Sequence, residues 1–128
     1  MKVLYVAPTS SMYGDNIALL KLVTDLKKRP DFSFCFVVRG VGDLTKELDR
    51  LGYDYFICRY YWNLYPPLSS LKDFLFLPLR VVYSWIKNII SLGRLVPLVH
   101  KYSPDIIHTN NGLVNMGYYT SLILGIPH

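Results

Sequence analysis

The chain has 128 residues, of which 52% are hydrophobic and 18% charged, and its formal net charge is +5. This length suits one domain rather than two, and the hydrophobic share excludes a disordered chain. Because a soluble domain carries about 25% charged residues, part of the apolar surface is expected to be covered by something outside this chain.

The two cysteines and the N-terminus exclude several further classes. Cys35 and Cys58 form no CxxC pair and have no histidine cluster nearby, so neither a disulfide framework nor a zinc site is expected, and both are predicted to be small buried strand residues. The apolar run after Lys2 is shorter than the core of a signal peptide, which needs about 7 to 15 residues. A cytoplasmic protein is therefore predicted.

The first half of the chain alternates strands and helices. Residues 3–7 form a short apolar run typical of a buried parallel strand, and a polar loop follows. Apolar residues then recur at helical spacing over 17–28, with Asp15 or Asn16 as the expected N-cap. A second strand is predicted over 32–38, and a helix over 43–51 ends at Gly52, where a left-handed residue is wanted.

The second half continues the alternation with one unusually long helix. A third strand over 55–58 leads into an aromatic, proline-containing loop. A helical region spans 71–102, with Pro78 and Pro97 as expected kinks or restarts. A fourth strand over 106–109 and a helix over 113–124, capped by Gly125, complete the pattern, and a fifth strand is expected to start at Ile126.

This order of elements predicts a single α/β domain over 1–128, a Rossmann-like three-layer sandwich. Right-handed crossovers give a parallel sheet of order 3-2-1-4, with its fifth strand truncated or missing. Ligands of such sheets bind at the carboxyl ends of the strands, where the winding reverses. That point lies between the first and fourth strands, so the loops over 10–16 and 110–115 are expected to face each other.

Both loops contain a glycine and open a helix, which suits a phosphate or an anionic sugar. The alternative is that Gly14 and Gly112 only permit tight turns. A dinucleotide-binding fingerprint is absent, because Gly14 is the only glycine after the first strand.

The segment after the third strand is a candidate site for a sugar. Arg59, Tyr61 and Trp62 follow that strand on its carboxyl side, and sugars stack on aromatic faces. A packed loop cover is the equal alternative.

The long helical region is the most apolar stretch of the chain and has the length of a membrane span. A span needs about 18 or more residues without charges, and Arg80, Lys87 and Arg94 interrupt this stretch, so a spanning helix is not expected. With Lys101 these residues recur every seventh position and form one basic stripe. The stripe is either the solvated back of a core helix or a contact with anionic lipid headgroups. Nucleic acid is disfavoured, because the basic residues are not clustered with stacking aromatics.

Three segments together resemble the N-terminal domain of the family-four GT-B glycosyltransferases. Residues 2–20 look like the opening strand and glycine loop of that family. Residues 104–110, Pro-Asp-Ile-Ile-His-Thr-Asn, are similar to its fourth-strand signature, and 125–128 to the approach to its fifth strand. The resemblance implies sugar transfer from a nucleotide-sugar donor, with no further cofactor and no metal assigned.

The resemblance also implies roles for particular residues. Gly14, with Asp15 and Asn16 beside it, would lie near the donor phosphates, although Asp15 stands where the family has a small residue or a second glycine. His108 matches the first histidine of the His-Thr-His-Asn pattern of the family, and Asn110 replaces the second, so these two residues are the catalytic candidates. On the residues alone, His108 at a strand end is more often a hydrogen-bonded core residue.

The partners follow from the same resemblance. The acceptor is expected to be a glycan or a lipid-linked acceptor in cell-surface polysaccharide or glycolipid assembly. The residues assigned to acceptor binding are Tyr13, Arg59, Tyr61, Trp62 and Asn111. Since the donor-binding C-terminal domain of the family is not in this chain, the polypeptide alone is predicted not to transfer sugar. The alternative function is a non-catalytic binding module that docks on a membrane, at the inner face of the cell membrane, or on a partner. An exposed sheet edge or exposed helices also predict a homodimer.

Overall fold

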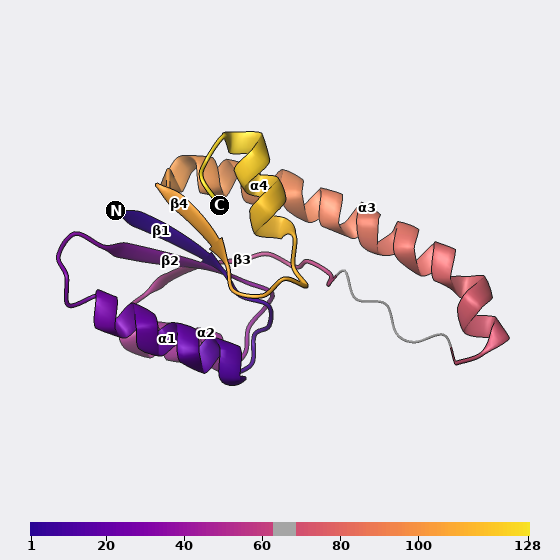
Figure 1. Cartoon of the computed structure of the whole chain (residues 1–128), viewed down its shortest axis with the longest axis horizontal. Coiled ribbons are helices and arrows are strands. Elements are labelled where there is room, and N and C mark those ends of the chain that lie inside the picture. Colours follow the sequence, from indigo (N-terminus) through magenta and orange to yellow (C-terminus); the bar gives the residue numbers. More distant parts are fainter. Residues whose placement is uncertain (63–68) are drawn as a thin grey trace.

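The computed structural model describes residues 1–62 and 69–128, so the end of the predicted aromatic loop lies outside the described residues. It is a three-layer α/β domain with helices on both faces of one sheet (Figure 1). The first four elements are β1 (Lys2–Val6), α1 (Gly14–Leu26), β2 (Ser33–Val38) and α2 (Asp43–Leu51). The others are β3 (Asp54–Ile57), α3 (Leu71–Tyr102), β4 (Ile106–Thr109) and α4 (Met116–Leu124).

The sheet has the predicted order, β3-β2-β1-β4, and the paired strands are parallel. In the register, Leu4 of β1 lies between Cys35 of β2 and Ile107 of β4, and all three residues are fully buried. Both faces are covered, which explains why β1 and β2 are almost continuously apolar. The predicted fold class is thus confirmed.

Alternate residues of the strands build two separate cores. Tyr5 and Phe36 stack with ring centroids 5.7 Å apart on the face covered by α1 and α2. Leu4 and Ile107 point to the other face, where Leu95 of α3 and other residues pack against them. Figure 1 shows α1 and α2 on one side of the sheet and α3 and α4 on the other.

The helix ends confirm two of the predicted boundaries and correct a third. Gly52 and Gly125 end α2 and α4 in the left-handed conformation, with φ of 69° and 65°. The prediction that Asp15 or Asn16 caps α1 is wrong, because the N-cap is Tyr13 and the helix begins at Gly14. Asp15 instead accepts a hydrogen bond from the backbone N–H of Asn16 (2.8 Å), and the Asn16 amide turns inward.

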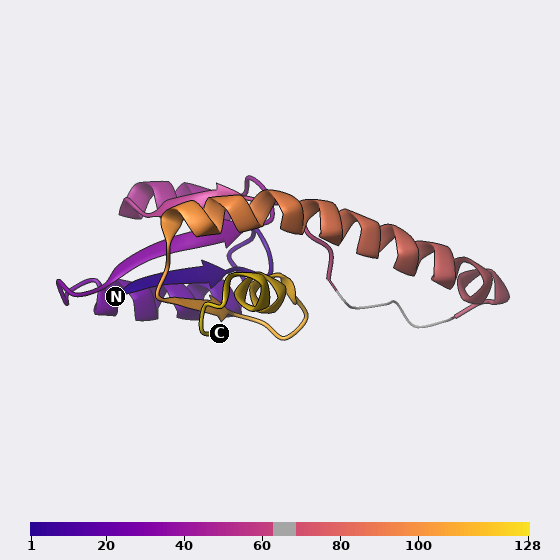
Figure 2. The ribbon, with the colours of Figure 1, turned by 90° about the horizontal axis from the view of Figure 1, so that it is seen from above.

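Helix α3 continues through Pro78 and Pro97, where kinks or restarts were expected, and it does not restart at either proline. Each proline frees the carbonyl four residues earlier, and these carbonyls belong to the exposed residues Phe74 and Gly93, where water can bind them. Only the last third of the helix packs on the sheet, through Leu95, Val99 and their neighbours. The remainder projects beyond the sheet (Figure 1 and Figure 2).

The projecting part corrects the membrane prediction made from the charges. By length and composition alone, α3 qualifies as a helix that could cross a membrane, and only 6% of its most apolar 18-residue window is buried. Arg80, Lys87 and Arg94 therefore do not by themselves exclude a spanning helix.

The C-terminal residues lie beside β4. The backbone N–H of Ile107 donates to the carbonyl of Pro127 (2.9 Å), at the place where a fifth strand was expected. Helix α4 packs closely on β4 because Gly117 has no side chain, and a Cβ there would lie 2.1 Å from Oγ1 of Thr109.

Candidate functional site

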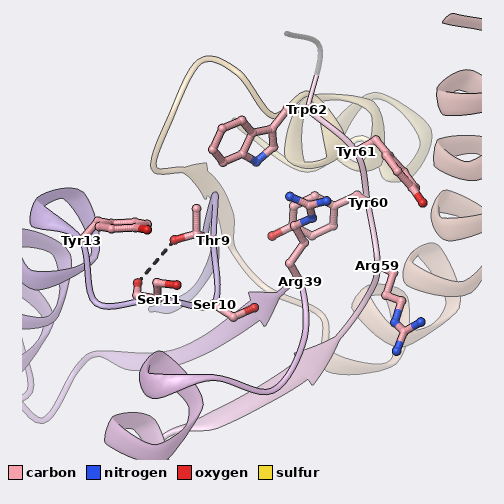
Figure 3. A pocket seen from close by; sticks show the side chains of 9 residues that line it. All are labelled: Thr9, Ser10, Ser11, Tyr13, Arg39, Arg59, Tyr60, Tyr61 and Trp62. Carbon is pink, nitrogen blue, oxygen red and sulfur yellow. Dashed lines mark hydrogen bonds between the residues drawn. The ribbon is translucent and has the colours of Figure 1, made fainter. Parts of the chain in front are cut away.

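A hollow of about 500 Å³ opens at the carboxyl edge of the sheet, beyond β1, β2 and β3 (Figure 3). This volume is within the range of small-molecule sites, about 300 to 1,000 Å³. Three loops supply its walls, and none of the described residues that line it is a carboxylate. The lining residues are Thr9, Ser10, Ser11, Tyr13, Arg39, Arg59, Tyr60, Tyr61 and Trp62.

The segment after β3 is held in place by buried hydrogen bonds. The hydroxyl of fully buried Tyr60 donates to the carbonyl of Ala7, which ties this segment to the end of β1. Burial raises the pKa of Tyr60, so the phenol stays protonated and remains a donor. Trp62 donates through Nε1 to the carbonyl of Pro8 (2.8 Å). The aromatic residues are therefore a fixed wall.

Helix α3 holds the same segment from the other side. Asn88 accepts from the backbone N–H of Tyr61 (2.7 Å) and donates to its carbonyl (3.2 Å). Ser91 donates to the carbonyl of Arg59. The Tyr61 ring also meets the ring of Tyr83 edge-on, with centroids 5.9 Å apart. The wall of the hollow and the long helix are thus joined by side-chain and backbone contacts.

The loop after β1 is shaped by Asn16, which is fully buried. Its Nδ2 donates to the carbonyl of Ser11 (2.7 Å), the carbonyl of Thr9 (3.3 Å) and Oγ1 of Thr9 (3.2 Å). Three acceptors around one atom identify that atom as the nitrogen. Asn16, which was predicted to lie beside a bound donor, is buried underneath this loop.

Gly14 is exposed and Asp15 half-buried in the first turn of α1. A carboxylate at this position is stabilised by the positive end of the helix, and it repels a phosphate that approaches the same end. The loop after β2 is locked to the loop after β1, because the backbone N–H of Leu44 donates to the carbonyl of Ser10 (3.0 Å). A Cβ on Gly42 would lie 2.4 Å from that same oxygen, so only glycine fits.

The two loops predicted to face each other between β1 and β4 do so. Nδ2 of Asn110 donates to the carbonyl of Asp15 (3.0 Å). The side chain of Asn111 forms a hydrogen bond within its own loop, because its Oδ1 accepts from the backbone N–H of Leu113 (2.9 Å). It was predicted to bind the acceptor, but it does not line the hollow.

His108 lies on β4 with its side chain exposed, and its ring meets the ring of Tyr5 edge-on, with centroids 5.2 Å apart. Partial burial lowers the pKa of His108 below its usual value, and the nearby His128 lowers it further. The imidazole is therefore neutral at pH 7 and able to accept a proton. It does not line the hollow.

The other acceptor candidates, Tyr13, Arg59, Tyr61 and Trp62, are brought together around the hollow. Arg59 points away from the others in Figure 3, and it also lines a smaller hollow of about 240 Å³ beside Cys58 and Arg94. Sequence reasoning missed Arg39, whose guanidinium carbon lies 5.7 Å from the Tyr61 ring centre and 5.9 Å from that of Trp62. Nothing in the sequence marks this residue, because it is a single arginine after a strand.

The four residues of the basic stripe have different surroundings. Arg80 is exposed and lies 3.5 Å from a carboxylate oxygen of Asp73. Lys87 is half-buried above the ring of Tyr83, at 5.3 Å from its centre. Arg94 and Lys101 are exposed on the part of α3 that packs on the sheet. Within residues 1–62 and 69–128, no three His, Cys, Asp or Glu side chains gather as a metal site would require.

The sequence matches no protein-family model and no curated protein. The structure is similar to MurG from Acinetobacter baumannii, with a TM-score of 0.69 and 12% identity over 98% of this chain and 33% of that protein. It is also similar to HepE (Alr3699) from Anabaena in complex with UDP and glucose, with a TM-score of 0.64, 14% identity and 99% and 28% coverage. A glycosyltransferase from Rickettsia africae gives a TM-score of 0.59, 18% identity and 96% and 27% coverage.

The chain therefore spans a third or less of the structures it matches, which corresponds to one Rossmann-like domain of a GT-B glycosyltransferase. At these identities the likeness establishes the fold alone, so membership of the particular family stays a prediction.

Proposed function

We propose that this chain is the acceptor-binding half of a glycosyltransferase, which moves a sugar from a nucleotide-sugar donor to a glycan or lipid-linked acceptor in cell-surface polysaccharide or glycolipid biosynthesis. The observation that carries the proposal is the hollow at the carboxyl edge of the sheet, with its aromatic wall and its hydroxyl groups. Ligands of open parallel sheets bind at this edge. The HepE structure contains UDP and glucose, the parts of a nucleotide sugar.

In this proposal the donor is held by a second domain that closes over the hollow. Stabilising the departing diphosphate requires cationic and N–H groups in a closed, water-poor cleft, and one domain cannot provide such a cleft. The isolated 128 residues should therefore bind acceptor without transferring sugar.

The catalytic candidates keep their predicted roles as part of the proposal. His108 would accept the proton of the attacking acceptor hydroxyl, for which its lowered pKa is suitable. Asn110 holds the loop that opens α1, through its bond to Asp15, so we assign it to positioning as well. Gly14 and Asp15 would face the donor, and Asn16 supports the loop from below.

A transfer assay tests the proposal. The entire product of the natural gene, at whatever length it is read, is incubated with radiolabelled nucleotide sugars and a panel of glycan and lipid-linked acceptors. We expect label in an acceptor, and we expect His108→Gln to reduce turnover by about 100-fold or more while the protein stays folded. Transfer by the 128 residues alone, or no transfer with any donor by the entire product, would contradict the proposal.

A second function, docking on a membrane, is favoured by the projecting part of α3. Over residues 71–90 the helix is about 30 Å long, and its exposed apolar side chains occupy about 200° of its circumference. They are Leu71, Phe74, Leu75, Phe76, Leu79, Val82, Tyr83, Trp85, Ile86, Ile89 and Ile90. Asp73, Arg80, Ser84, Lys87 and Asn88 occupy the opposite side, whereas Lys72 falls within the apolar arc.

This segregation favours a helix that lies in the membrane interface over one that crosses the bilayer, because the charged side would otherwise be placed in hydrocarbon. We propose that the apolar side enters the headgroup boundary of an anionic membrane at the inner face of the cell membrane. Arg80 and Lys87, on the polar side, would face the headgroups.

Co-sedimentation with vesicles of phosphatidylglycerol and phosphatidylcholine tests the docking. We expect the chain to sediment with them, and Val82→Glu with Ile86→Glu to remain in the supernatant. Leu22→Glu is the matched control, because Leu22 on α1 is as exposed as Ile86 (52% and 51%). Equal loss in the control, or no sedimentation of the unmodified chain, would contradict the proposal. Self-association in light scattering that Val82→Glu with Ile86→Glu abolishes would assign the surface to a homodimer instead.

A further inference from the structure

One of the two arginines that line the hollow, Arg39, has no counter-ion within the described part of the chain. Arg39 follows the last residue of β2, and its guanidinium makes cation–π contacts with the rings of Tyr61 and Trp62. Among the described residues around the hollow, no side chain is a carboxylate. The N–H groups of a guanidinium in such contacts can still form two parallel hydrogen bonds with an anion.

Neutral donors surround the same space. The hydroxyls of Ser10, Ser11 and Tyr13 line the hollow (Figure 3), and none of the three makes a side-chain hydrogen bond within the described part of the chain. The backbone that carries them is fixed, because Asn16 binds the carbonyl of Ser11 and Leu44 binds the carbonyl of Ser10. A cation and several hydroxyl donors, held on a fixed backbone, form a preorganised binding site for an anion.

The aromatic wall adds a second requirement on the ligand. Both rings are half-buried: that of Trp62 is held by its Nε1 hydrogen bond, and that of Tyr61 packs edge-on against Tyr83. They therefore offer flat apolar surface at little cost in side-chain entropy. The hollow therefore suits a ring with an apolar face that carries an anionic substituent. A free inorganic anion would leave this wall uncovered.

We propose that the hollow recognises a sugar bearing an anionic group, a phosphate or a carboxylate, and that Arg39 is the residue that binds this group. The identification of this sugar as the acceptor rests on the proposed function. The anion site itself does not rest on it, because it is argued from Arg39, the hydroxyls and the aromatic wall.

Tryptophan fluorescence tests the site directly in the 128-residue chain. The chain has two tryptophans, Trp62 in the hollow and Trp85 on the exposed side of α3. Trp85→Phe leaves Trp62 as the reporter. Glucose 6-phosphate, glucuronate and glucose are the titrants, so the first two distinguish a phosphate from a carboxylate. We expect a saturable change with at least one of them and none with glucose over the same range.

Substitutions assign the effect to Arg39. We expect Arg39→Gln to weaken binding at least 10-fold and Arg39→Lys to weaken it less, because lysine keeps the charge and loses the planar fork. Arg29→Gln is the matched control, since it removes the same charge at an exposed position between α1 and β2, at the opposite edge of the sheet. Circular dichroism melting curves verify that each variant is folded.

Equal binding of glucose, or unchanged binding by Arg39→Gln, would overturn the inference. An equal loss of affinity in Arg29→Gln would also overturn the inference, because the binding would then depend on the net charge of the chain and not on Arg39. Sugar transfer by the entire gene product to acceptors with neither anionic group would overturn the identification of the anionic sugar as the acceptor and leave the proposed function intact. Anion binding at Arg39 in a protein that transfers no sugar would leave the anion site intact and overturn the proposed function.

Discussion

Replacing Asn16 by aspartate should destabilise the fold in a pH-dependent way. Nδ2 donates to three oxygens of Thr9 and Ser11, and Oδ1 is buried without a hydrogen-bond partner in the described part of the chain. Asn16→Asp keeps the shape and turns a donor into an acceptor. The new carboxylate faces three oxygens in a site that water does not reach.

The magnitude follows from these contacts. Each buried acceptor left without a donor costs about 1 to 3 kcal/mol, and Thr9 and Ser11 are half-buried, so the lower end applies to their oxygens. Burying the charge adds a few kcal/mol, which gives about 3 to 5 kcal/mol at pH 8. This is a large share of the stability of a small domain, about 5 to 15 kcal/mol.

The pH dependence has a definite sign. Burial raises the pKa of the new carboxyl above its usual value of about 3.9, so the folded state holds the proton more tightly than the unfolded state. The variant therefore loses stability as pH rises between these two pKa values, by up to about 1.4 kcal/mol per pH unit. At pH 5 the protonated carboxyl still donates one hydrogen bond, and the loss is smaller.

Urea unfolding followed by circular dichroism, at pH 5 and pH 8, measures the effect against the unmodified chain. Asn115→Asp is the control, because Asn115 is the N-cap of α4 and makes no side-chain capping bond, so a carboxylate there is neutral or stabilising. A difference for Asn16→Asp below about 1 kcal/mol at pH 8, or the same difference at both pH values, would refute the reasoning.

Three further outcomes are expected. Leu95→Ala should lower the free energy of unfolding by about 2 to 5 kcal/mol in urea titrations, because Leu95 is fully buried, whereas Leu98→Ala on the exposed side should change little. Gly42→Ala should lower the melting temperature through its clash with the Ser10 loop, while Gly112→Ala has open space and should not. His108 should titrate below its usual pKa of about 6.5 in NMR spectra, because burial disfavours its charged form, and an equal or higher midpoint would contradict this.

The order and type of the elements could be predicted because each is marked by local signals. Apolar runs without helical spacing mark β1 and β2, and Gly52 and Gly125 mark helix ends. The start of α1 could not be predicted, because Asp15 and Asn16 both have the side chains of N-caps and both use them elsewhere. Which bond a capping residue makes depends on the loop it meets, and that is a tertiary property.

The candidate site was predictable in part for a similar reason. Tyr61 and Trp62 follow a strand at its carboxyl end, so topology alone placed them near the hollow. Arg39 comes next to them only through the order of β2 and β3 in the sheet and the turn of the chain after Tyr60. A solitary arginine has no spacing pattern, and its importance comes entirely from its neighbours in space.

Two hydrogen bonds join Asn88 of α3 to the backbone of Tyr61 in the wall of the hollow. Within the described part of the chain, α3 packs on the sheet through its last third, and its earlier residues project beyond the sheet (Figure 1). We therefore expect a displacement of the projecting part to be passed to the backbone of Tyr61, whose ring contacts the guanidinium of Arg39. Binding of a surface or a partner to α3 would then change the position of this wall of the hollow.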